Sequence, residues 1–384
     1  MIKNAILLGC TTLFGLALVE VFLYLAPDYQ AGEPIARVVF CTEPAHEREP
    51  SARFGEIATP ASVYYRSESE ADGWYLRAYN GDGFRDLLDT GGENVIVIGD
   101  SYIEGELVNN DRTIGYLLDS WNPDLAFHEF ALGGWGTVDE GRAYHAVGGE
   151  IPHKLVILGY YVGNDLADNL HAKEQPKLDH AADEEGSLLF RLHVLLRAYS
   201  RAYTFFYVNG RLMALEWMGK DSLEDQYVPA DAVEAGAAVT RQELQAIADE
   251  ATSNGAELLI VTIPSWNEFI GIEGEQRLAA KQRETIDAVA AGGGRVHILD
   301  LKPVIEAGGY EHLYGRIDKH LTAEGYYLAA KAINQWVNGV WRHRPTDTPA
   351  MVDDKAPVRP DCAASRNLLK AFSQPAASPM AHKA

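Results

Sequence analysis

The sequence is poor in cysteine and in positive charge. Only three cysteines occur among 384 residues, and none stands at the spacing of a metal site. Lysine and arginine number 33 against 55 aspartates and glutamates, which gives a formal net charge of −22. Because contacts to nucleic-acid phosphates need clustered Lys and Arg, this balance argues against a nucleic-acid partner.

Long apolar runs are also absent, except at the amino terminus. Residues 5–26 are almost entirely apolar, and Glu20 is the only charged residue among them. This length fits one membrane-spanning helix, and Lys3 before it favours a cytoplasmic amino terminus. We therefore expect a single-pass signal anchor over residues 1–26, which places the remaining chain in the periplasm or outside the cell. The alternative is a cleaved signal peptide and a secreted protein.

The three cysteines are spread over the whole chain. Cys10 lies in the predicted anchor, while Cys41 and Cys362 lie near the two ends of the remaining sequence. In an oxidising compartment Cys41 and Cys362 could pair, but the sequence leaves this open.

From residue 93 onward, strand-like and helix-like patterns alternate. Strand-like runs occupy 94–99, 126–131, 154–160, 256–263 and 295–301, and helical patterns lie near 113–120, 138–147, 240–254, 276–291 and 322–341. Such alternation predicts a five-stranded parallel sheet with helices on both faces. With right-handed crossovers, the expected fold class is α/β, a three-layer α/β/α sandwich.

The remaining segments have other compositions. Residues 27–60 are rich in Pro, Glu and Ala and read as a linker to a domain over 61–343. The stretch near 166–235 interrupts the alternation with amphipathic helical patterns and is predicted as an insertion packed on the domain surface. A lid over the site or a face resting on a membrane are its other interpretations. Residues 344–384, rich in Pro, Ala and Ser, are predicted to be a disordered tail.

Short polar or glycine-rich blocks follow three of the predicted strands. The first run ends in Gly-Asp-Ser and places the hydroxyl of Ser101 at the carboxyl edge of the sheet, where open α/β folds bind ligands. A glycine-rich loop with Gly136 follows the second run, and Asn164 follows the third. Asp318 and His320 come just before the last helix. Each block alone is an ordinary turn, whereas together they offer a nucleophile, an oxyanion site and a base.

In this order the four blocks resemble the SGNH (GDSL-type) hydrolase superfamily over about residues 80–341. The lead-in Asn-Gly-Asp-Gly-Phe-Arg-Asp at 80–86 and the Gly-Asn-Asp-x-x-Asp-Asn stretch at 163–169 are similar to the membrane-anchored bacterial branch. The resemblance implies a flavodoxin-like α/β/α fold and a serine esterase that needs no metal and no organic cofactor.

The resemblance also implies a role for each matched residue. Ser101 would be the nucleophile, His320 its general base, and Asp318 the group that holds the imidazole tautomer. The oxyanion hole would consist of the backbone N–H groups of Ser101 and Gly136 and the side-chain amide of Asn164. The Asp318-x-His320 spacing is one residue shorter than the usual Asp-x-x-His of the superfamily.

The sequence thus predicts an extracytoplasmic serine esterase that hydrolyses O-acyl groups, in particular acetyl groups, on carbohydrate through an acyl-enzyme. An O-acetyltransferase acting on an exported polysaccharide, a lipase or phospholipase, and a catalytically silent glycan-binding or assembly protein are the alternatives. The expected partners are a small-molecule or glycan ester and, through the amino-terminal helix, a membrane. The acyl group, the alcohol and the oligomeric state stay open.

Overall fold

The structure is a computed structural model of the whole chain. The residues that it describes are 2–25, 37–43, 45–67, 74–88, 90–166, 168–169, 192, 196, 200–203, 205–207, 232–271, 273–292, 295–315, 319–346, 348–351, 360–363 and 365.

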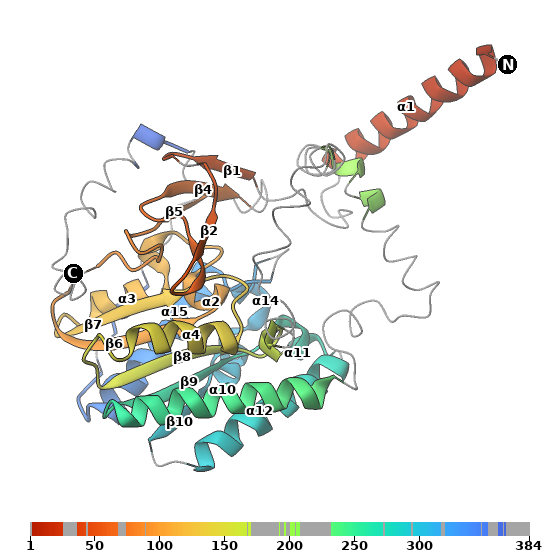
Figure 1. The fold of residues 1–384 in the computed structure, drawn as a ribbon. Coiled ribbons are helices and arrows are strands. Elements are labelled where there is room, and N and C mark those ends of the chain that lie inside the picture. The colour runs from red at the N-terminus through yellow and green to blue at the C-terminus, as the bar shows by residue number, and fades with distance from the viewer. Residues whose placement is uncertain are drawn as a thin grey trace.

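A five-stranded parallel sheet forms the centre of the molecule (Figure 1). Its strands are β6 (Glu93–Gly99), β7 (Leu125–Ala131), β8 (Leu155–Tyr161), β9 (Glu257–Ile263) and β10 (Val296–Asp300), in the order β10-β9-β8-β6-β7. All neighbours pair in parallel. The predicted α/β fold class and the five predicted strands are therefore confirmed.

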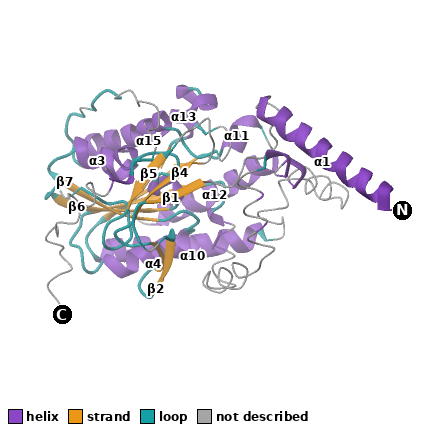
Figure 2. Ribbon diagram, turned by 90° about the horizontal axis from the view of Figure 1, so that it is seen from above, coloured by secondary structure: helices purple, strands orange, loops and turns teal. Residues whose placement is uncertain are grey.

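Helices cover both faces of this sheet, as Figure 2 shows from above. Ile96 and Ile98 of β6 pack toward α4, α10 and α12, whereas Val95 and Val97 pack toward α2, α3, α13 and α15. Because both faces of the sheet are covered at β6 and β8, these two strands have continuous apolar runs, as expected for parallel sheets. The helices are α2 (Ser101–Glu104), a 3₁₀ turn η2 (Asn110–Arg112), α3 (Ile114–Trp121), α4 (Thr137–Val147), α10 (Val233–Ser253), α11 (Trp266–Ile270), α12 (Glu273–Gly292), α13 (Lys302–Gly308), α14 (Tyr310–Leu313), α15 (Ala323–Trp336) and a π-helical turn η4 (Val337–Trp341).

Two small antiparallel sheets precede the central one in the chain. β1 (Arg37–Phe40), β4 (Val63–Ser67) and β5 (Tyr75–Ala78) form one, and β2 (Arg48–Ser51) and β3 (Gly55–Ala58) form the other. The linker predicted over 27–60 is thus wrong for these strands. β1, β2 and β3 are only four residues long each, and β1 pairs with β4, which lies more than twenty residues further along the chain, so no local pattern reveals these strands.

The amino-terminal segment is helical, as α1 (Ile2–Leu25). In Figure 1 this helix extends away from the central sheet. Over the residues whose side chains the structure describes, no helix is both long enough and apolar enough to cross a membrane. The use of α1 as a membrane anchor therefore stays a prediction.

Part of the predicted tail is ordered and joins the small β1-β4-β5 sheet. Cys362 forms a disulfide with Cys41, and the two Cα atoms lie 4.9 Å apart. Ser365 is buried, and its hydroxyl lies 2.6 Å from that of Tyr65. The prediction of a disordered tail over 344–384 is wrong for these residues, because a covalent bond to a distant part of the chain holds them.

The predicted insertion over 166–235 lies largely outside the described residues. Within it the structure describes a few residues before Leu170, Leu192, Leu196, most of 200–207 and the start of α10. Ser200, Arg201 and Ala202 of this region contact α1.

Removal of the disulfide tests how strongly it stabilises the chain. The double substitution Cys41→Ser with Cys362→Ser is expected to lower the free energy of unfolding by about 2–4 kcal/mol, because it frees a loop that spans most of the chain. Chemical denaturation measures this loss. Cys10→Ser is the control and is expected to change nothing, and equal stability of the double variant would contradict the pairing.

Asp119 is a buried carboxyl between α3 and β7. Its Oδ1 accepts hydrogen bonds from the N–H of Phe127 at 2.8 Å and from the hydroxyl of Thr90 at 3.3 Å. Burial raises the pKa of Asp119 from 3.8 to about 8. The folded state therefore binds a proton that the unfolded chain releases above about pH 4.

This difference in proton binding predicts a stability that falls with pH. As the pH rises from 4 to 8, the titration of Asp119 lowers the free energy of unfolding by about 1 kcal/mol for each pH unit. Asp119→Asn keeps the carbonyl acceptor and removes the titration, so it is expected to match the wild type at pH 4 and to exceed it at pH 8. Denaturation at a series of pH values measures both, with the exposed Asp111→Asn as control. Parallel profiles for wild type and Asp119→Asn would contradict this assignment.

Candidate active site

The end of β6 and the start of α2 position Ser101. A Cβ on Gly99 would lie 2.2 Å from Cγ1 of Ile103, so glycine lets α2 fold back onto the strand end. The carboxylate of Asp100 caps α2 by accepting a hydrogen bond from the N–H of Tyr102 at 2.9 Å. Ser101 is the first residue of the helix, where the backbone N–H has no intrahelical acceptor. This N–H is therefore available to an anionic oxygen.

His320 lies against Ser101 although 219 residues separate them. The imidazole Nε2 is 2.7 Å from the Ser101 hydroxyl oxygen, a hydrogen-bond distance. Tyr102 joins the two segments, because its hydroxyl donates to the carbonyl of Lys319 at 3.0 Å and its ring lies 4.8 Å from the imidazole. Lys319 has a positive φ of 63°, which costs a non-glycine residue free energy. The contact from Tyr102 thus holds a strained backbone next to His320.

The pairing of the strands brings the predicted oxyanion residues to the same edge as Ser101. Gly99 of β6 is in register with Ala131 of β7 on one side and with Gly159 of β8 on the other. Gly136 comes five residues after Ala131, and Asn164 comes five residues after Gly159. The loops that carry the two residues therefore start on either side of the Ser101 loop.

Gly136 and the Asn164 turn are packed against each other. A Cβ on Gly136 would lie 2.8 Å from Oδ1 of Asn169 and 2.9 Å from Cβ of Asp168, so only glycine fits. The Asn164 amide donates one hydrogen to Asp168 at 2.8 Å. An amide carries two such hydrogens, which leaves the second one for a substrate oxygen.

Asp318 lies outside the described residues, so the orientation of His320 by this carboxylate stays a prediction. Two other acids act on His320 electrostatically. Burial opposes their ionisation, whereas a positive charge on His320 lowers the pKa of both Asp100 and Glu106. By the same interaction, their negative charges stabilise an imidazolium at His320.

Buried carboxyl groups lie beneath the site. Burial raises the pKa of Asp100 to about 7, and burial together with neighbouring acids raises the pKa of Glu140 and Asp165 well above their usual range. Asp165 accepts the N–H of Tyr161 at 2.9 Å, which ties the Asn164 turn to the end of β8. The raised pKa of Glu140 and Asp165 favours their neutral forms, which weakens their repulsion of a negative oxygen at the site.

Glu104 connects α2 to the glycine loop. It stands at the end of α2 and is 1% exposed. One of its oxygens accepts the N–H of Gly133 at 2.6 Å, and the other accepts the Tyr79 hydroxyl at 2.7 Å and lies 2.7 Å from the Arg77 guanidinium. The position of the loop that carries Gly136 is therefore set by a carboxylate three residues after Ser101.

The amino-terminal strands supply the charges that balance Glu104. Arg77 of β5 also lies 3.1 Å from Glu106, and Arg66 of β4 lies at the same distance from that residue. Burial would raise the pKa of Glu106, but Arg77 and Arg66 hold it far below its usual range. Because a buried carboxylate needs such partners, the small sheet is part of the site's support.

Several of these residues escaped the sequence reasoning. Glu104, Arg77 and Tyr79 are ordinary residues in their local context, and their contacts join segments that are separate in the chain. One supporting residue does lie in a sequence motif, the Asn-Gly-Asp-Gly-Phe-Arg-Asp stretch at 80–86. Within it, Arg85 is buried and donates to the carbonyl of Glu104 at 3.0 Å, so it supports the end of α2.

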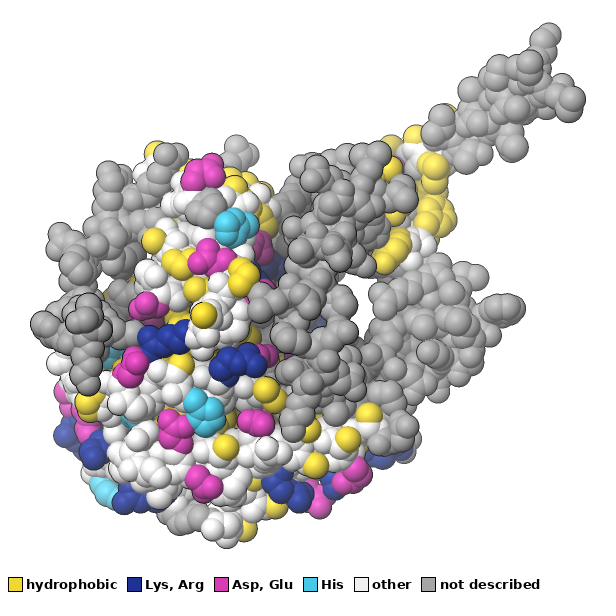
Figure 3. All heavy atoms as spheres, viewed as in Figure 1, with side chains coloured by type: hydrophobic (Ala, Val, Ile, Leu, Met, Phe, Trp, Pro, Cys, Tyr) yellow, Lys and Arg dark blue, Asp and Glu magenta, His cyan; other side chains and the backbone are white. Residues whose placement is uncertain are grey.

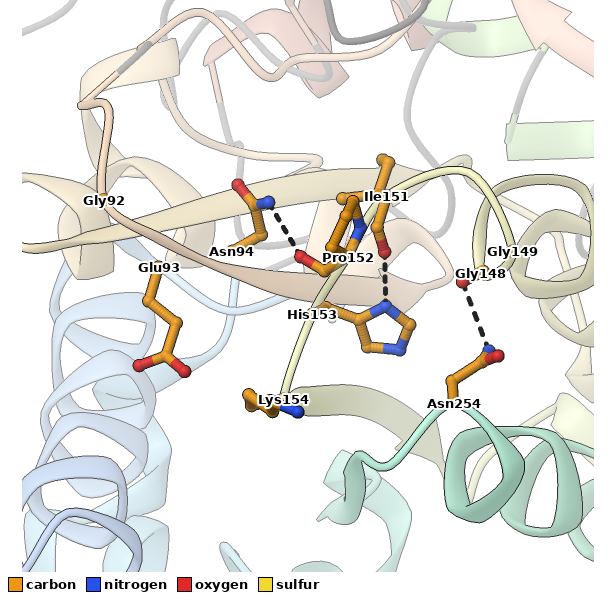
Figure 4. A pocket seen from close by; sticks show the side chains of 10 residues that line it. All are labelled: Gly92, Glu93, Asn94, Gly148, Gly149, Ile151, Pro152, His153, Lys154 and Asn254. Carbon is orange, nitrogen blue, oxygen red and sulfur yellow. Dashed lines mark hydrogen bonds between the residues drawn. The ribbon is translucent and has the colours of Figure 1, made fainter.

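A cavity of about 430 Å³ lies at the opposite, amino edge of the sheet (Figure 4). Three of its polar side chains are hydrogen-bonded to backbone carbonyls: Asn94 to Pro152, His153 to Ile151 and Asn254 to Gly148. His153 also lies 3.0 Å from the Tyr144 hydroxyl, and burial lowers its pKa. These groups hold the loops at this edge together, and the cavity is separate from Ser101.

Comparisons with known proteins give matches only among solved structures. Neither the known protein families nor the curated proteins include a match to this chain. The crystal structure of TesA is 14% identical, with a TM-score of 0.40, and the match covers 64% of this chain and 98% of that one. A member of the lipolytic protein G-D-S-L family from Veillonella parvula is 13% identical, with a TM-score of 0.39 and coverage of 63% and 96%. The psychrotrophic esterase EstA from Pseudoalteromonas sp. is 10% identical, with a TM-score of 0.40 and coverage of 66% and 100%.

The second of these structures carries the same G-D-S-L description as the superfamily that the sequence motifs resemble. At identities and TM-scores this low, the likeness does not bear on what this chain does. The geometry around Ser101 is what the functional argument rests on.

Substitution of Glu104 tests its positioning role. In Glu104→Gln an amide nitrogen replaces one acceptor, so the Gly133 loop loses its hydrogen bond or Tyr79 and Arg77 lose theirs. If Gly136 serves the oxyanion, kcat on an ester is expected to fall by up to about 10²-fold with KM nearly unchanged. Steady-state kinetics of the folded variant measures this.

Tyr79→Phe is a second variant with a smaller structural effect, because it removes one hydrogen bond to Glu104 and leaves the contact of Glu104 with Gly133 in place. A smaller loss of kcat is expected for it. An unchanged kcat in folded Glu104→Gln would rule out the positioning role.

Proposed function

We propose that this chain is a serine esterase of SGNH type, with Ser101 as nucleophile and His320 as general base. The observation that carries the proposal is the 2.7 Å contact between the Ser101 hydroxyl and the imidazole Nε2 at the carboxyl edge of a parallel sheet. A nucleophile and a base within hydrogen-bond reach are the structural signature of covalent catalysis. The order of the four sequence blocks gives independent support.

The reaction proceeds in two steps. Ser101 Oγ attacks the ester carbonyl carbon while His320 Nε2 accepts the hydroxyl proton. The negative oxygen accepts hydrogen bonds from the N–H groups of Ser101 and Gly136 and from the Asn164 amide. The bond to the alcohol then breaks as the imidazolium protonates the leaving oxygen. Water attacks the acyl-Ser101 with His320 again as base, and a carboxylic acid leaves.

Asp318 is assigned the orientation of His320 in this scheme. A carboxylate on Nδ1 keeps Nε2 free to accept a proton and stabilises the imidazolium that forms. The assignment rests on the sequence order, since Asp318 lies outside the described residues.

The proposed location is outside the cytoplasm, with α1 as a single-pass membrane anchor and a secreted form as the alternative. The disulfide between Cys41 and Cys362 supports this location, because such bonds persist in oxidising compartments. The apolar run over 5–26 supports the anchor.

The proposed substrates are O-acyl esters on carbohydrate, with acetyl as the acyl group. An O-acetyltransferase on an exported polysaccharide uses the same acyl-enzyme with a sugar hydroxyl in place of water. A lipase or phospholipase and a silent glycan-binding protein are the remaining alternatives, and the substrate class rests on the superfamily resemblance.

Esters of short and long acyl chains test the proposal. Wild type is expected to hydrolyse acetyl esters, and Ser101→Ala is expected to lose this activity by about 10⁴-fold or more. A fluorophosphonate probe is expected to label the wild type and not the variant. Ser120→Ala, at an exposed serine of α3, is the matched control and is expected to keep both properties.

The outcomes separate the alternatives. Activity that survives in Ser101→Ala would overturn the mechanism, and a folded wild type that neither reacts with the probe nor hydrolyses esters would favour the silent protein. A preference for long acyl chains would favour a lipase. Transfer of the acyl group to an added oligosaccharide, in place of release as free acid, would favour the transferase.

A further inference from the structure

Exposed large hydrophobic side chains are concentrated at one end of the molecule. Of the twelve such side chains in the described part of the chain, nine belong to α1 or to residues 192–207. Figure 3 shows hydrophobic side chains gathered on the described part of α1. We call eight of these nine side chains, all except Leu192, the apolar surface: Phe14, Leu16, Leu18, Val21, Phe22 and Leu25 of α1 with Phe206 and Tyr207.

The single charge of the apolar run, the carboxylate of half-buried Glu20, is bonded to the neighbouring segment. The carboxylate of Glu20 accepts hydrogen bonds from the Ser200 hydroxyl at 2.8 Å and from the N–H groups of Arg201 and Ala202 at 2.9 Å each. These three donors satisfy an ion that would otherwise be costly in an apolar medium. Glu20 thus joins α1 to segment 200–207.

A second contact strengthens this joint. The Arg201 guanidinium donates to the carbonyl of Leu23 at 3.2 Å, in the last turn of α1. A cation at this position is favourable, because the last carbonyls of a helix carry partial negative charge. Leu23 itself is only 2% exposed, so the two segments pack together.

The distribution of exposed side chains around α1 shows what kind of medium covers it. Phe14 is 67% exposed and Leu16 is 42% exposed, yet the two point about 160° apart around the helix axis. A protein partner covers one stripe of a helix, whereas a helix that is apolar on all sides needs a surrounding apolar medium. A lipid bilayer provides this medium.

The aromatic side chains of segment 200–207 fit the edge of such a bilayer. Phe206 and Tyr207 are exposed beside the end of α1, and the rings of Tyr203 and Tyr207 lie 6.3 Å apart. Aromatic side chains gather where a bilayer meets water, and arginine keeps its charged end at that level.

We propose that segment 200–207 is docked on α1 through Glu20 and lies, with Phe206 and Tyr207, in the interfacial layer of a lipid bilayer. This inference rests on the membrane anchor of the proposed function. It adds a second attachment of the catalytic domain to the membrane, because residues 200–207 belong to the segment between Asn164 and α10 and not to the chain that follows α1.

Spin labels in vesicles of phosphatidylcholine and phosphatidylglycerol test this placement. In the full chain with Cys10→Ser, a nitroxide is attached at Phe206→Cys and, as matched control, at Val340→Cys. Both side chains are 51% exposed, but Val340 lies outside the apolar surface. The ratio of collisions with oxygen to collisions with a water-soluble nickel chelate is expected to be several-fold higher at position 206. Equal ratios at the two positions would overturn the inference.

A third label at Leu16→Cys separates this inference from the anchor itself. A high ratio at position 16 with a low ratio at 206 leaves the anchor standing and overturns only the interfacial docking. Low ratios at both positions overturn both. Shielding of position 206 from both reagents, with spin–spin broadening that grows with protein concentration, would assign the surface to a second copy of the chain and would also overturn the inference.

Glu20 is tested in the same vesicles. Glu20→Ala removes all three hydrogen bonds and is expected to lower the ratio at position 206 to that at 340, while position 16 stays immersed. Glu20→Gln keeps one acceptor and is expected to give a smaller change. Ester hydrolysis reports folding in each variant, and an unchanged ratio at 206 in Glu20→Ala would overturn the docking role.

Discussion

The parallel pairing of β6 with β7 and β8 is the constraint on which the proposed site depends. In a parallel sheet all carboxyl ends lie at one edge, so the loops after three neighbouring strands meet there. Gly99 stands opposite both Ala131 and Gly159, and the polar residues follow at short intervals beyond each. A shift of one residue in this register would move every side chain of a strand to the other face and would separate the groups.

Burial of charge is the second theme of the molecule. The edge of the sheet that carries Ser101 rests on carboxyl groups: burial raises the pKa of Glu140 and Asp165, whereas two arginines lower the pKa of Glu106. Glu104 lies in the same region, and its carboxylate oxygens bind the N–H of Gly133 in the glycine loop, the Tyr79 hydroxyl and the Arg77 guanidinium. Because the small antiparallel sheet supplies Arg77 and lies just before Tyr79, the amino-terminal strands and the edge of the sheet that carries Ser101 form one structural unit. The disulfide to Cys362 closes this unit.

The long regular elements were predictable, and the short ones were not. β6 and β8 have continuous apolar runs and stand between helical patterns, so their type follows from the sequence alone. β1 is four residues long and is stabilised by pairing with β4, which no window of neighbouring residues contains. The prediction of a disordered tail was wrong at Cys362 for a related reason. The composition of the tail is that of a disordered segment, but Cys362 forms a disulfide with a cysteine 321 residues away.

The sequence by itself determined which chemical groups stand at the strand ends and in what order, because strand type and chain order are local properties. Ser101, Gly136, Asn164 and His320 were candidates from that order alone. Only the tertiary structure decided that His320 lies against Ser101, that Glu104 holds the Gly133 loop, and that Glu20 joins α1 to segment 200–207. These contacts form between residues far apart in the chain, where the free energy comes from burial and from satisfying buried polar groups rather than from local propensity.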